Sequence, residues 1–176
     1  MGETFLKGSD RKYRSSLSGK RLNDVLRSTD FSPKAEMIEA LGSLRKPEEK
    51  EYWLQMSEDE IRKMSASKWT TIGSHGYFHN DLAQVSGVSL QEELHWSKDY
   101  LEKITRKEIN ALAFPYGSHS SETITAAKAA GYSRLLATEH VLPQHAGDPA
   151  LKERFTVNPF ISTINQMHAN IRGHYR

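Results

Sequence analysis

Blocks of apolar and polar positions predict alternating helices and strands from residue 57 onward. Ser57-Glu58-Asp59-Glu60 has the form of a capping box, in which serine and glutamate side chains satisfy free backbone N–H groups at a helix start. Ser89-Leu90-Gln91-Glu92 has the same form and predicts the start of a longer helix. The other expected elements are a buried strand at 69–74, a strand at 109–114, a helix from Ser120 to Gly131, strands at 132–138 and 155–157, and a last helix at 162–172.

This alternation is typical of a parallel α/β sheet or barrel. One strand–helix unit takes roughly 30 residues. Residues 57–138 therefore hold about three units, which is too few to close an eight-stranded barrel. The pattern predicts an α/β fold that is built around a parallel sheet.

The first part of the chain lacks this regular alternation, and we divide the sequence into segments 1–50 and 51–176. The N-terminal segment is polar and locally basic, which indicates a solvated arm, mostly helical or irregular. Within it, residues 33–44 predict one helix, with Ser32 as its cap and Pro33 in its first position. The expected apolar face of this helix consists of Met37, Ile38, Leu41 and Leu44.

The amino-acid composition argues against several classes of function. The chain of 176 residues has 24 basic and 22 acidic side chains, a balance that argues against a dedicated nucleic-acid surface. It has no cysteine, so that disulfides, thiolate zinc sites and cysteine nucleophiles are excluded. No apolar stretch has the length of a signal peptide or a membrane span. We expect a cytoplasmic protein as the chain stands, and an extracytoplasmic one if an upstream segment is missing.

A pair of histidines is the clearest chemical feature. His75 and His79 follow the predicted strand 69–74 directly. Side chains four residues apart meet on one face of a helical turn. Neutral imidazole is a preferred ligand of zinc and similar metals. The spacing therefore indicates a metal site, held by His75 and His79, at the end of a strand.

A second feature also follows a predicted strand. The run Phe114-Pro115-Tyr116-Gly117 comes at the end of the strand at 109–114. Active sites of parallel α/β folds gather at the carboxyl ends of the strands, because the loops converge there. We therefore expect the histidine pair and the Pro-Tyr-Gly run to form one site.

These residues resemble the polysaccharide deacetylases, carbohydrate esterase family 4, which include the nodulation-type chitooligosaccharide deacetylases. The family's histidine motif is His, Ser or Thr, two residues, His, two residues and Leu, and the run from His75 to Leu82 is similar to it. Leu112-Ala113-Phe114-Pro115-Tyr116-Gly117 is similar to the family's strand motif Arg-x-Pro-Tyr-Gly. The resemblance covers residues 56–160. It implies a partial or irregular (β/α) barrel of the polysaccharide deacetylase type.

Four parts of the family pattern differ or are missing. The motif Thr-Phe-Asp-Asp-Gly, which supplies the catalytic base and a metal-binding aspartate in the family, has no counterpart in this sequence. Gly76 stands where the family has Ser or Thr. Ala113 stands in the place of the motif arginine, with Arg154 as a candidate replacement. The last motif, Leu-x-His, has its nearest counterpart at Met167-His168.

The resemblance implies a hydrolase of carbon–nitrogen bonds other than peptide bonds, which removes N-acetyl groups from a polysaccharide or oligosaccharide. His75 and His79 would bind a divalent metal, with zinc as the expected ion. The metal would polarise the acetyl carbonyl and activate water, while the backbone N–H of Tyr116 would stabilise the oxyanion. Phe114, Pro115 and Tyr116 would contact the sugar. No residue is assigned as the base or as the third metal ligand.

Two other functions compete with this hydrolase. A catalytically impaired carbohydrate-binding or assembly module would keep the fold without a competent metal. Its groove would be lined by Trp69, Tyr77, Phe78 and Tyr116. Missing strands would leave a face for a second copy to cover, so that we expect a homodimer. A nucleic-acid module would depend on the basic arm at 7–21 alone.

Overall fold

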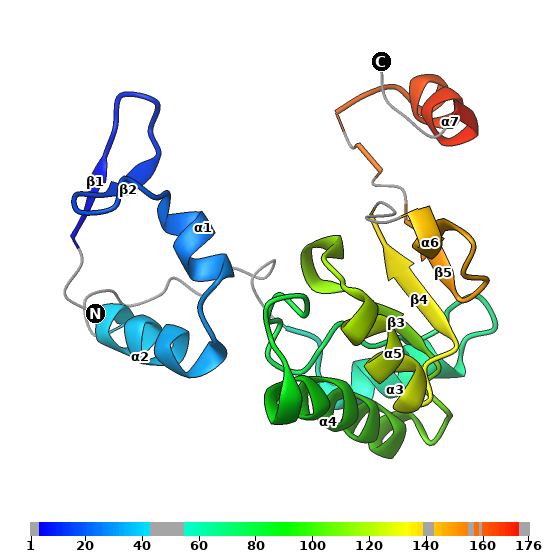
Figure 1. Ribbon diagram of the computed structural model, residues 1–176. Coiled ribbons are helices and arrows are strands. Elements are labelled where there is room, and N and C mark those ends of the chain that lie inside the picture. The colour runs from blue at the N-terminus through cyan, green and yellow to red at the C-terminus, as the bar shows by residue number, and fades with distance from the viewer. Residues whose placement is uncertain (1–3, 43–54, 139–142, 155–156, 159, 173–176) are drawn as a thin grey trace.

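The protein is built around a parallel sheet. The computed structural model describes residues 4–42, 55–138, 143–154, 157–158 and 160–172. The sheet has the order β3 (Ala111–Ala113), β4 (Arg134–Ala137) and β5 (Leu151–Glu153), and neighbouring strands are parallel (Figure 1). Ser74 extends this order on the β3 side, because it forms a parallel bridge with Leu112. Sequence order and spatial order therefore coincide, as in part of a (β/α) barrel.

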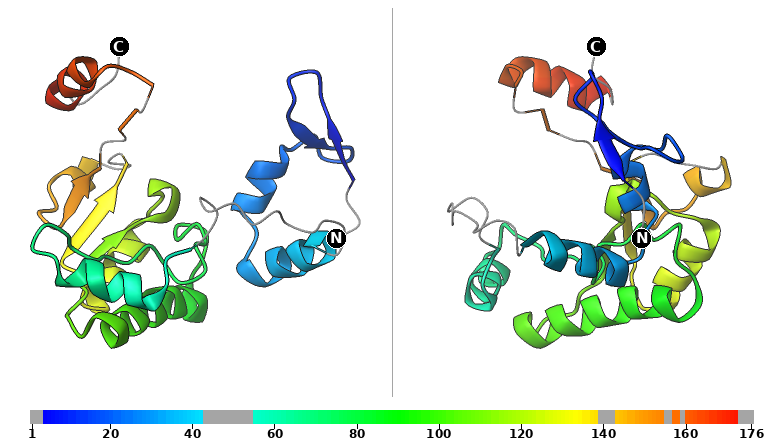
Figure 2. Two further views of the ribbon diagram at one scale, coloured as in Figure 1. Left: turned by 180° about the vertical axis from the view of Figure 1, so that it is seen from behind. Right: turned by 90° about the vertical axis from the view of Figure 1, so that its left-hand side faces the viewer.

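Helices connect the strands as the alternation predicts. The described α-helices of this part are α3 (Glu58–Ala66), α4 (Gly87–Thr105), α5 (Ser121–Ala129), α6 (Pro143–Ala146) and α7 (Thr163–Arg172). α4 packs against both α3 and α5, so that these three helices form one layer beside the sheet (Figures 1 and 2). The α/β class and the partial barrel are thereby confirmed.

The core lies between this helical layer and the sheet. Leu90 and Leu94 of α4 and Leu112 and Leu135 of the sheet are almost completely buried. Tyr132 fills the largest volume among the fully buried side chains, and its hydroxyl donates to the Leu94 carbonyl at 2.8 Å. The apolar stripe of α4 recurs at helical spacing, which is why this helix forms against the sheet.

Several predicted boundaries are confirmed. Ser57 and Glu60 form the expected capping box at the start of α3. Ser120 caps α5 by accepting the N–H of Thr123 at 3.1 Å. Gly131, just beyond α5, has a φ of +88°, which a glycine adopts without strain. The last helix also begins near Ser162, as the sequence predicts.

Other predictions at this level are wrong. No strand covers 69–74: only Ser74 pairs with β3, and Trp69 is 84% exposed rather than buried. The second capping box is not formed, because α4 already begins at Gly87 and Ser89 lies inside it. The strand expected at 155–157 falls largely outside the described residues, and the observed strand β5 precedes it.

The N-terminal segment contains more structure than the single helix predicted for it. A hairpin of β1 (Phe5–Lys7) and β2 (Tyr13–Ser15) precedes two helices, α1 (Leu22–Arg27) and α2 (Phe31–Gly42). α2 begins before Ser32, so this serine is not its cap. The apolar face expected at Met37, Ile38, Leu41 and Leu44 lies outside the described side chains.

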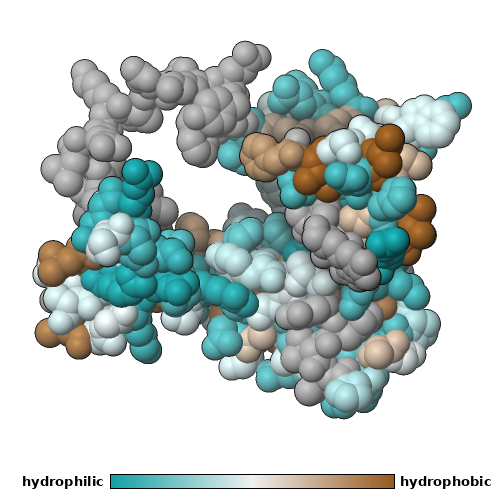
Figure 3. All heavy atoms as spheres, turned by 90° about the horizontal axis from the view of Figure 1, so that it is seen from above, coloured by the Kyte–Doolittle hydropathy of each residue, from teal (hydrophilic) through white to brown (hydrophobic). Residues whose placement is uncertain are grey.

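The C-terminal helix α7 stands away from the sheet in both side views (Figures 1 and 2). Ile164, Met167 and Ile171 of this helix are 68%, 57% and 82% exposed. Seen from above, apolar side chains gather on the side of the molecule where α7 lies (Figure 3). None of the described helices has the length and apolar character needed to cross a bilayer.

Candidate functional site

The two sequence motifs meet at one edge of the sheet, as predicted. His75 follows the bridge at Ser74, and Phe114-Pro115-Tyr116-Gly117 follows β3. Parallel strands bring their carboxyl ends to the same edge. The rings of His79 and Tyr116 accordingly lie 5.1 Å apart between centroids, and those of His75 and His79 lie 4.9 Å apart.

One imidazole of the pair has its ring orientation fixed by a backbone hydrogen bond. Nδ1 of His75 lies 2.5 Å from the carbonyl oxygen of Ala113, which can only accept a hydrogen bond. Nδ1 therefore carries the proton in the neutral ring, and Nε2 keeps a free lone pair. Such a bond to the second ring nitrogen fixes the tautomer and orientation of metal-binding histidines.

Electrostatics also favours the neutral form of His75. Partial burial lowers the pKa of this ring from its ordinary value of 6.5, and the nearby His79 and Arg154 act in the same direction. The hydrogen bond to Ala113 opposes these effects only in part. A neutral imidazole is the form that binds a metal, so His75 is available as a ligand at neutral pH.

A buried glutamate of α4 holds the loop between the two histidines. Oε2 of Glu93 accepts the backbone N–H groups of Tyr77 at 2.6 Å and Phe78 at 2.9 Å, and Oε1 accepts that of Asn80 at 3.0 Å. Glu93 has no exposed surface. These three bonds fix a turn in which His79 adopts a φ of +57°, an unusual value for a residue other than glycine.

The same glutamate explains why glycine stands at position 76. The φ of Gly76 is +80°, and a Cβ atom there would lie 2.9 Å from Oε2 of Glu93. A serine or threonine would therefore be strained and would crowd the carboxylate. The loop is held here by a carboxylate from α4 instead of a hydroxyl within the motif.

Sequence reasoning missed Glu93, although a signal was present. Leu90, Glu93, Leu94 and Ser97 are all buried and follow the spacing of one helix face. A carboxylate within such a face must find hydrogen-bond donors in the interior. Its position on the apolar face of α4 therefore pointed to a structural partner.

Tyr116 occupies the surface of the site. Its φ of +59° places it in a left-handed turn, its side chain is 45% exposed, and no hydrogen bond between described residues uses its backbone N–H. The next residue, Gly117, is packed against Thr138, so closely that a Cβ atom would lie 2.0 Å from Oγ1 of that threonine. Only glycine fits there, and this contact fixes the turn that presents Tyr116.

Phe114 and Pro115 lie beneath this surface. Phe114 is completely buried, and its ring stacks on His119 at 5.3 Å between centroids. Pro115 is also among the fully buried side chains. Of the three predicted sugar contacts, Tyr116 alone presents an exposed ring, and the roles of Phe114 and Pro115 stay predictions.

An aromatic cluster adjoins the histidines. Tyr77 and Phe78 lie edge-on to Trp96 of α4, with centroid distances of 5.6 Å and 5.8 Å, and Phe31 of α2 stacks on Phe78 at 4.5 Å. Tyr77 and Trp96 are 47% and 45% exposed. Trp69, which was expected beside Tyr77 and Phe78, makes none of these ring contacts and instead packs under Lys68.

The N-terminal segment reaches the rim of the site. Nε of Arg27 lies 2.6 Å from Oδ2 of Asp81, whose side chain is 2% exposed. The same guanidinium lies over the ring of Tyr116, at 4.9 Å from its centroid. Asp81 is therefore occupied by an ion pair and does not serve the histidines.

The described residues fit a metal site in part. His75 and His79 supply two imidazole donors on one side of a surface edge. Within the described ranges, no third His, Cys, Asp or Glu joins them to make a set of three possible ligands. Catalytic zinc sites usually have three protein ligands. A third ligand and a base would have to come from outside the described residues.

Comparison with known proteins decides the family. The polysaccharide deacetylase family matches residues 46–135, which is more than half of the chain. The chain belongs to the polysaccharide deacetylase family. The matched range contains both motifs, α4 with Glu93, and β3.

Solved structures of this polysaccharide deacetylase's relatives share its fold. The Streptococcus pyogenes deacetylase PplD, solved in complex with acetate, has 23% identity and a TM-score of 0.58 over 67% of this chain. The Bacillus cereus polysaccharide deacetylase BC0361 has 23% identity and a TM-score of 0.56 over 78% of this chain. The chain spans 52% and 47% of these two structures, about half the length of each. No curated protein matches it significantly.

Proposed function

We propose that this chain is a metal-dependent hydrolase of carbon–nitrogen bonds that removes N-acetyl groups from a polysaccharide or oligosaccharide. The observation that carries the proposal is the arrangement at the sheet edge. His75, with Nδ1 bonded to Ala113, the neighbouring His79, and Tyr116, whose N–H has no hydrogen-bond partner among the described residues, all belong to loops that converge at this one edge. Family membership supports the same chemistry.

Each residue has a part in this proposal. His75 and His79 would hold a divalent metal, with zinc as the ion suited to imidazole donors. The bound metal would polarise the acetyl carbonyl and lower the pKa of a water. The N–H of Tyr116 would donate to the oxyanion that forms on the carbonyl oxygen. Glu93 would act as a positioning residue, because it holds the loop between the two ligands.

The aromatic cluster supports a sugar substrate. Tyr77, two residues before His79, and Trp96 of α4 are both nearly half exposed, and their rings lie edge-on to each other. Such rings combine a large apolar area with little loss of side-chain entropy on binding. They suit the apolar faces of pyranose rings, so that sugars adjoining the reactive one would lie over this cluster.

The proposal requires a carboxylate that the described residues do not supply at the site. A base must take the proton of the attacking water. The described part of the chain has no Asp or Glu grouped with the histidine pair. The base would come from residues outside the described ranges, from a second copy, or from another chain.

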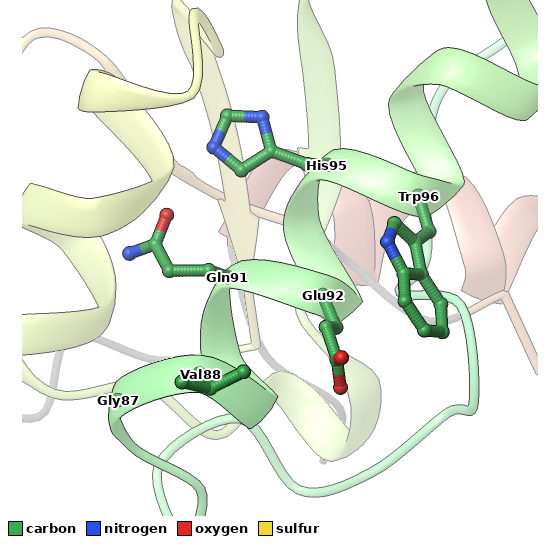
Figure 4. A pocket seen from close by; sticks show the side chains of 6 residues that line it. All are labelled: Gly87, Val88, Gln91, Glu92, His95 and Trp96. Carbon is green, nitrogen blue, oxygen red and sulfur yellow. The ribbon is translucent and has the colours of Figure 1, made fainter.

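Metal content is the first test. The purified protein, His75→Ala and the control His95→Ala, which alters a surface histidine of α4 (Figure 4), are compared by elemental mass spectrometry. We expect zinc, cobalt or nickel in the protein and in the control, and its loss in His75→Ala. An acetyl-release assay on N-acetylated oligosaccharides then follows. A folded, metal-free protein would refute the hydrolase.

A binding or assembly module is the second candidate. It is favoured by the ligand set, which stops at two histidines within the described residues, and by the exposed apolar residues of α7. This candidate predicts oligosaccharide binding through Tyr77 and Trp96 without acetyl release. It also predicts a homodimer, which light scattering at micromolar concentration would detect. A monomer that binds no sugar would exclude it.

A further inference from the structure

Arg27 brings a positive charge from the N-terminal segment to the rim of the candidate site. It is the last residue of α1, and its Nε lies 2.6 Å from Oδ2 of Asp81, two residues beyond His79. Its guanidinium also lies over the ring of Tyr116, at 4.9 Å from the centroid. The backbone N–H of Tyr116 is the oxyanion donor of the proposed function. Arg27 therefore borders the position at which a substrate would react.

Two contacts hold this guanidinium in place. The carboxylate of Asp81 is buried, so that it has little water to replace its counter-ion. The ring of Tyr116 attracts the flat face of the guanidinium. A charged group that is already held in one orientation loses less entropy on binding a ligand than a freely moving one does. The guanidinium of Arg27 is therefore preorganised for a ligand.

The terminal nitrogens of Arg27 are not used by these contacts. Within the described part of the chain, neither Nη1 nor Nη2 forms a hydrogen bond or an ion pair, and the side chain is 46% exposed. The N–H groups of a guanidinium form a planar fork that matches the two oxygens of a carboxylate. An anion at this rim can therefore bind to Arg27 without displacing Asp81.

The N-terminal unit that carries Arg27 is docked at the site and is basic. Phe31 of α2 stacks on Phe78 of the histidine loop at 4.5 Å between centroids. Residues 4–42 contain eight basic and five acidic side chains, and they precede the family match at 46–135. The positive charge at this rim is therefore a feature of this chain for which membership of the family does not account.

We propose that Arg27 selects an acidic N-acetylated polysaccharide as the substrate. This inference rests on the proposed function and adds the substrate class to it. The guanidinium binds the carboxylate of a uronic acid that adjoins the N-acetylated sugar at Tyr116. Hydrogen bonds between two charged groups are about twice as strong as those between neutral groups. Arg27 thus determines specificity and takes no part in the chemical step.

Binding of two oligosaccharides to the purified full chain, without added metal, tests this inference. Hyaluronan tetrasaccharide, in which glucuronate alternates with N-acetylglucosamine, is compared with chitotetraose, a neutral oligosaccharide of equal length. Isothermal titration calorimetry gives the two Kd values. We expect the acidic oligosaccharide to bind about tenfold more tightly at low salt, and we expect this preference to shrink as the ionic strength rises.

Three variants assign the preference to one side chain. Arg27→Gln should bind the two oligosaccharides equally. Because this variant leaves the buried Asp81 without its counter-ion, the double variant Arg27→Gln/Asp81→Asn repeats the test with a neutral pair that can form a hydrogen bond. The control is Arg21→Gln, since Arg21 is exposed at the other end of the same helix. This control should keep the full preference for the acidic oligosaccharide.

Several results would overturn the inference. These are equal Kd values in the unaltered protein, binding of neither oligosaccharide, and a preference that persists in both Arg27 variants. Tighter binding of a single-stranded DNA oligomer at the same salt concentration would overturn it in favour of a nucleic-acid surface. All of these results leave the hydrolase standing, because metal content and acetyl release are measured separately. Conversely, a preference that depends on Arg27 in a chain that binds no metal would retain the acidic-sugar site and refute the hydrolase.

Discussion

Replacing Glu93 by glutamine tests whether a single carboxylate organises the candidate site. The carboxylate accepts three backbone N–H groups, from Tyr77, Phe78 and Asn80, and is completely buried. Glutamine has nearly the same shape but only one acceptor oxygen. In its best orientation the amide oxygen keeps the bonds to Tyr77 and Phe78, while its NH₂ group faces the N–H of Asn80.

The expected loss follows from these contacts. One buried N–H group left without an acceptor costs about 1–3 kcal/mol. The two remaining bonds lose the strengthening that a charged acceptor provides. We therefore expect a destabilisation of about 3 kcal/mol, which for a protein of this size corresponds to a fall in Tm of about 10 °C.

The assay combines thermal unfolding with amide hydrogen exchange. Glu93→Gln should lower Tm and speed exchange at Tyr77, Phe78 and Asn80. The control is Glu92→Gln, because this neighbour on α4 lines a surface depression instead (Figure 4). Surface changes of this kind usually alter stability by less than about 0.5 kcal/mol. Equal Tm values and unchanged exchange in the two variants would refute the assigned role of Glu93.

Two further predictions concern the helix start and the histidine. Ser57→Ala should lower the free energy of unfolding by about 1 kcal/mol, because it removes the cap of α3. Ser89→Ala, which lies inside α4, should instead raise the free energy of unfolding by a few tenths of a kcal/mol. Equal losses of stability in thermal unfolding of the two variants would contradict the assigned helix starts. The pKa of His75 is below 6.5, so this ring stays neutral in the folded protein where the unfolded chain takes up a proton. The neutral ring therefore makes its full contribution to stability above pH 6.5, the pKa in the unfolded chain. This contribution is lost as the pH falls from 6.5 toward the lower pKa of His75 in the folded protein. A proton NMR titration of the His75 ring with a midpoint at or above 6.5 would exclude this environment.

The local pattern was sufficient for the class of fold and for the place of the site. The capping residues Ser57 and Ser120 and the turn at Gly131 were predictable, because their effects depend on neighbours along the chain. The meeting of His79 with Tyr116 was predictable as well, because parallel strands end at one edge. Both conclusions use only spacing and alternation.

The residues that hold the candidate site in place act through tertiary contacts, so that the sequence pattern did not predict them. Glu93 bonds a loop 13 to 16 residues away, and Arg154 bonds Phe114 across 40 residues. The failure of the strand at 69–74 has the same origin, since a strand exists only where a neighbour accepts its hydrogen bonds, and Ser74 alone bridges to β3. The sequence by itself determined the kind of fold and predicted which residues lie together at the candidate site. Tertiary structure alone decided which buried groups hold them, because burial and hydrogen-bond partners arise between segments that no local pattern connects.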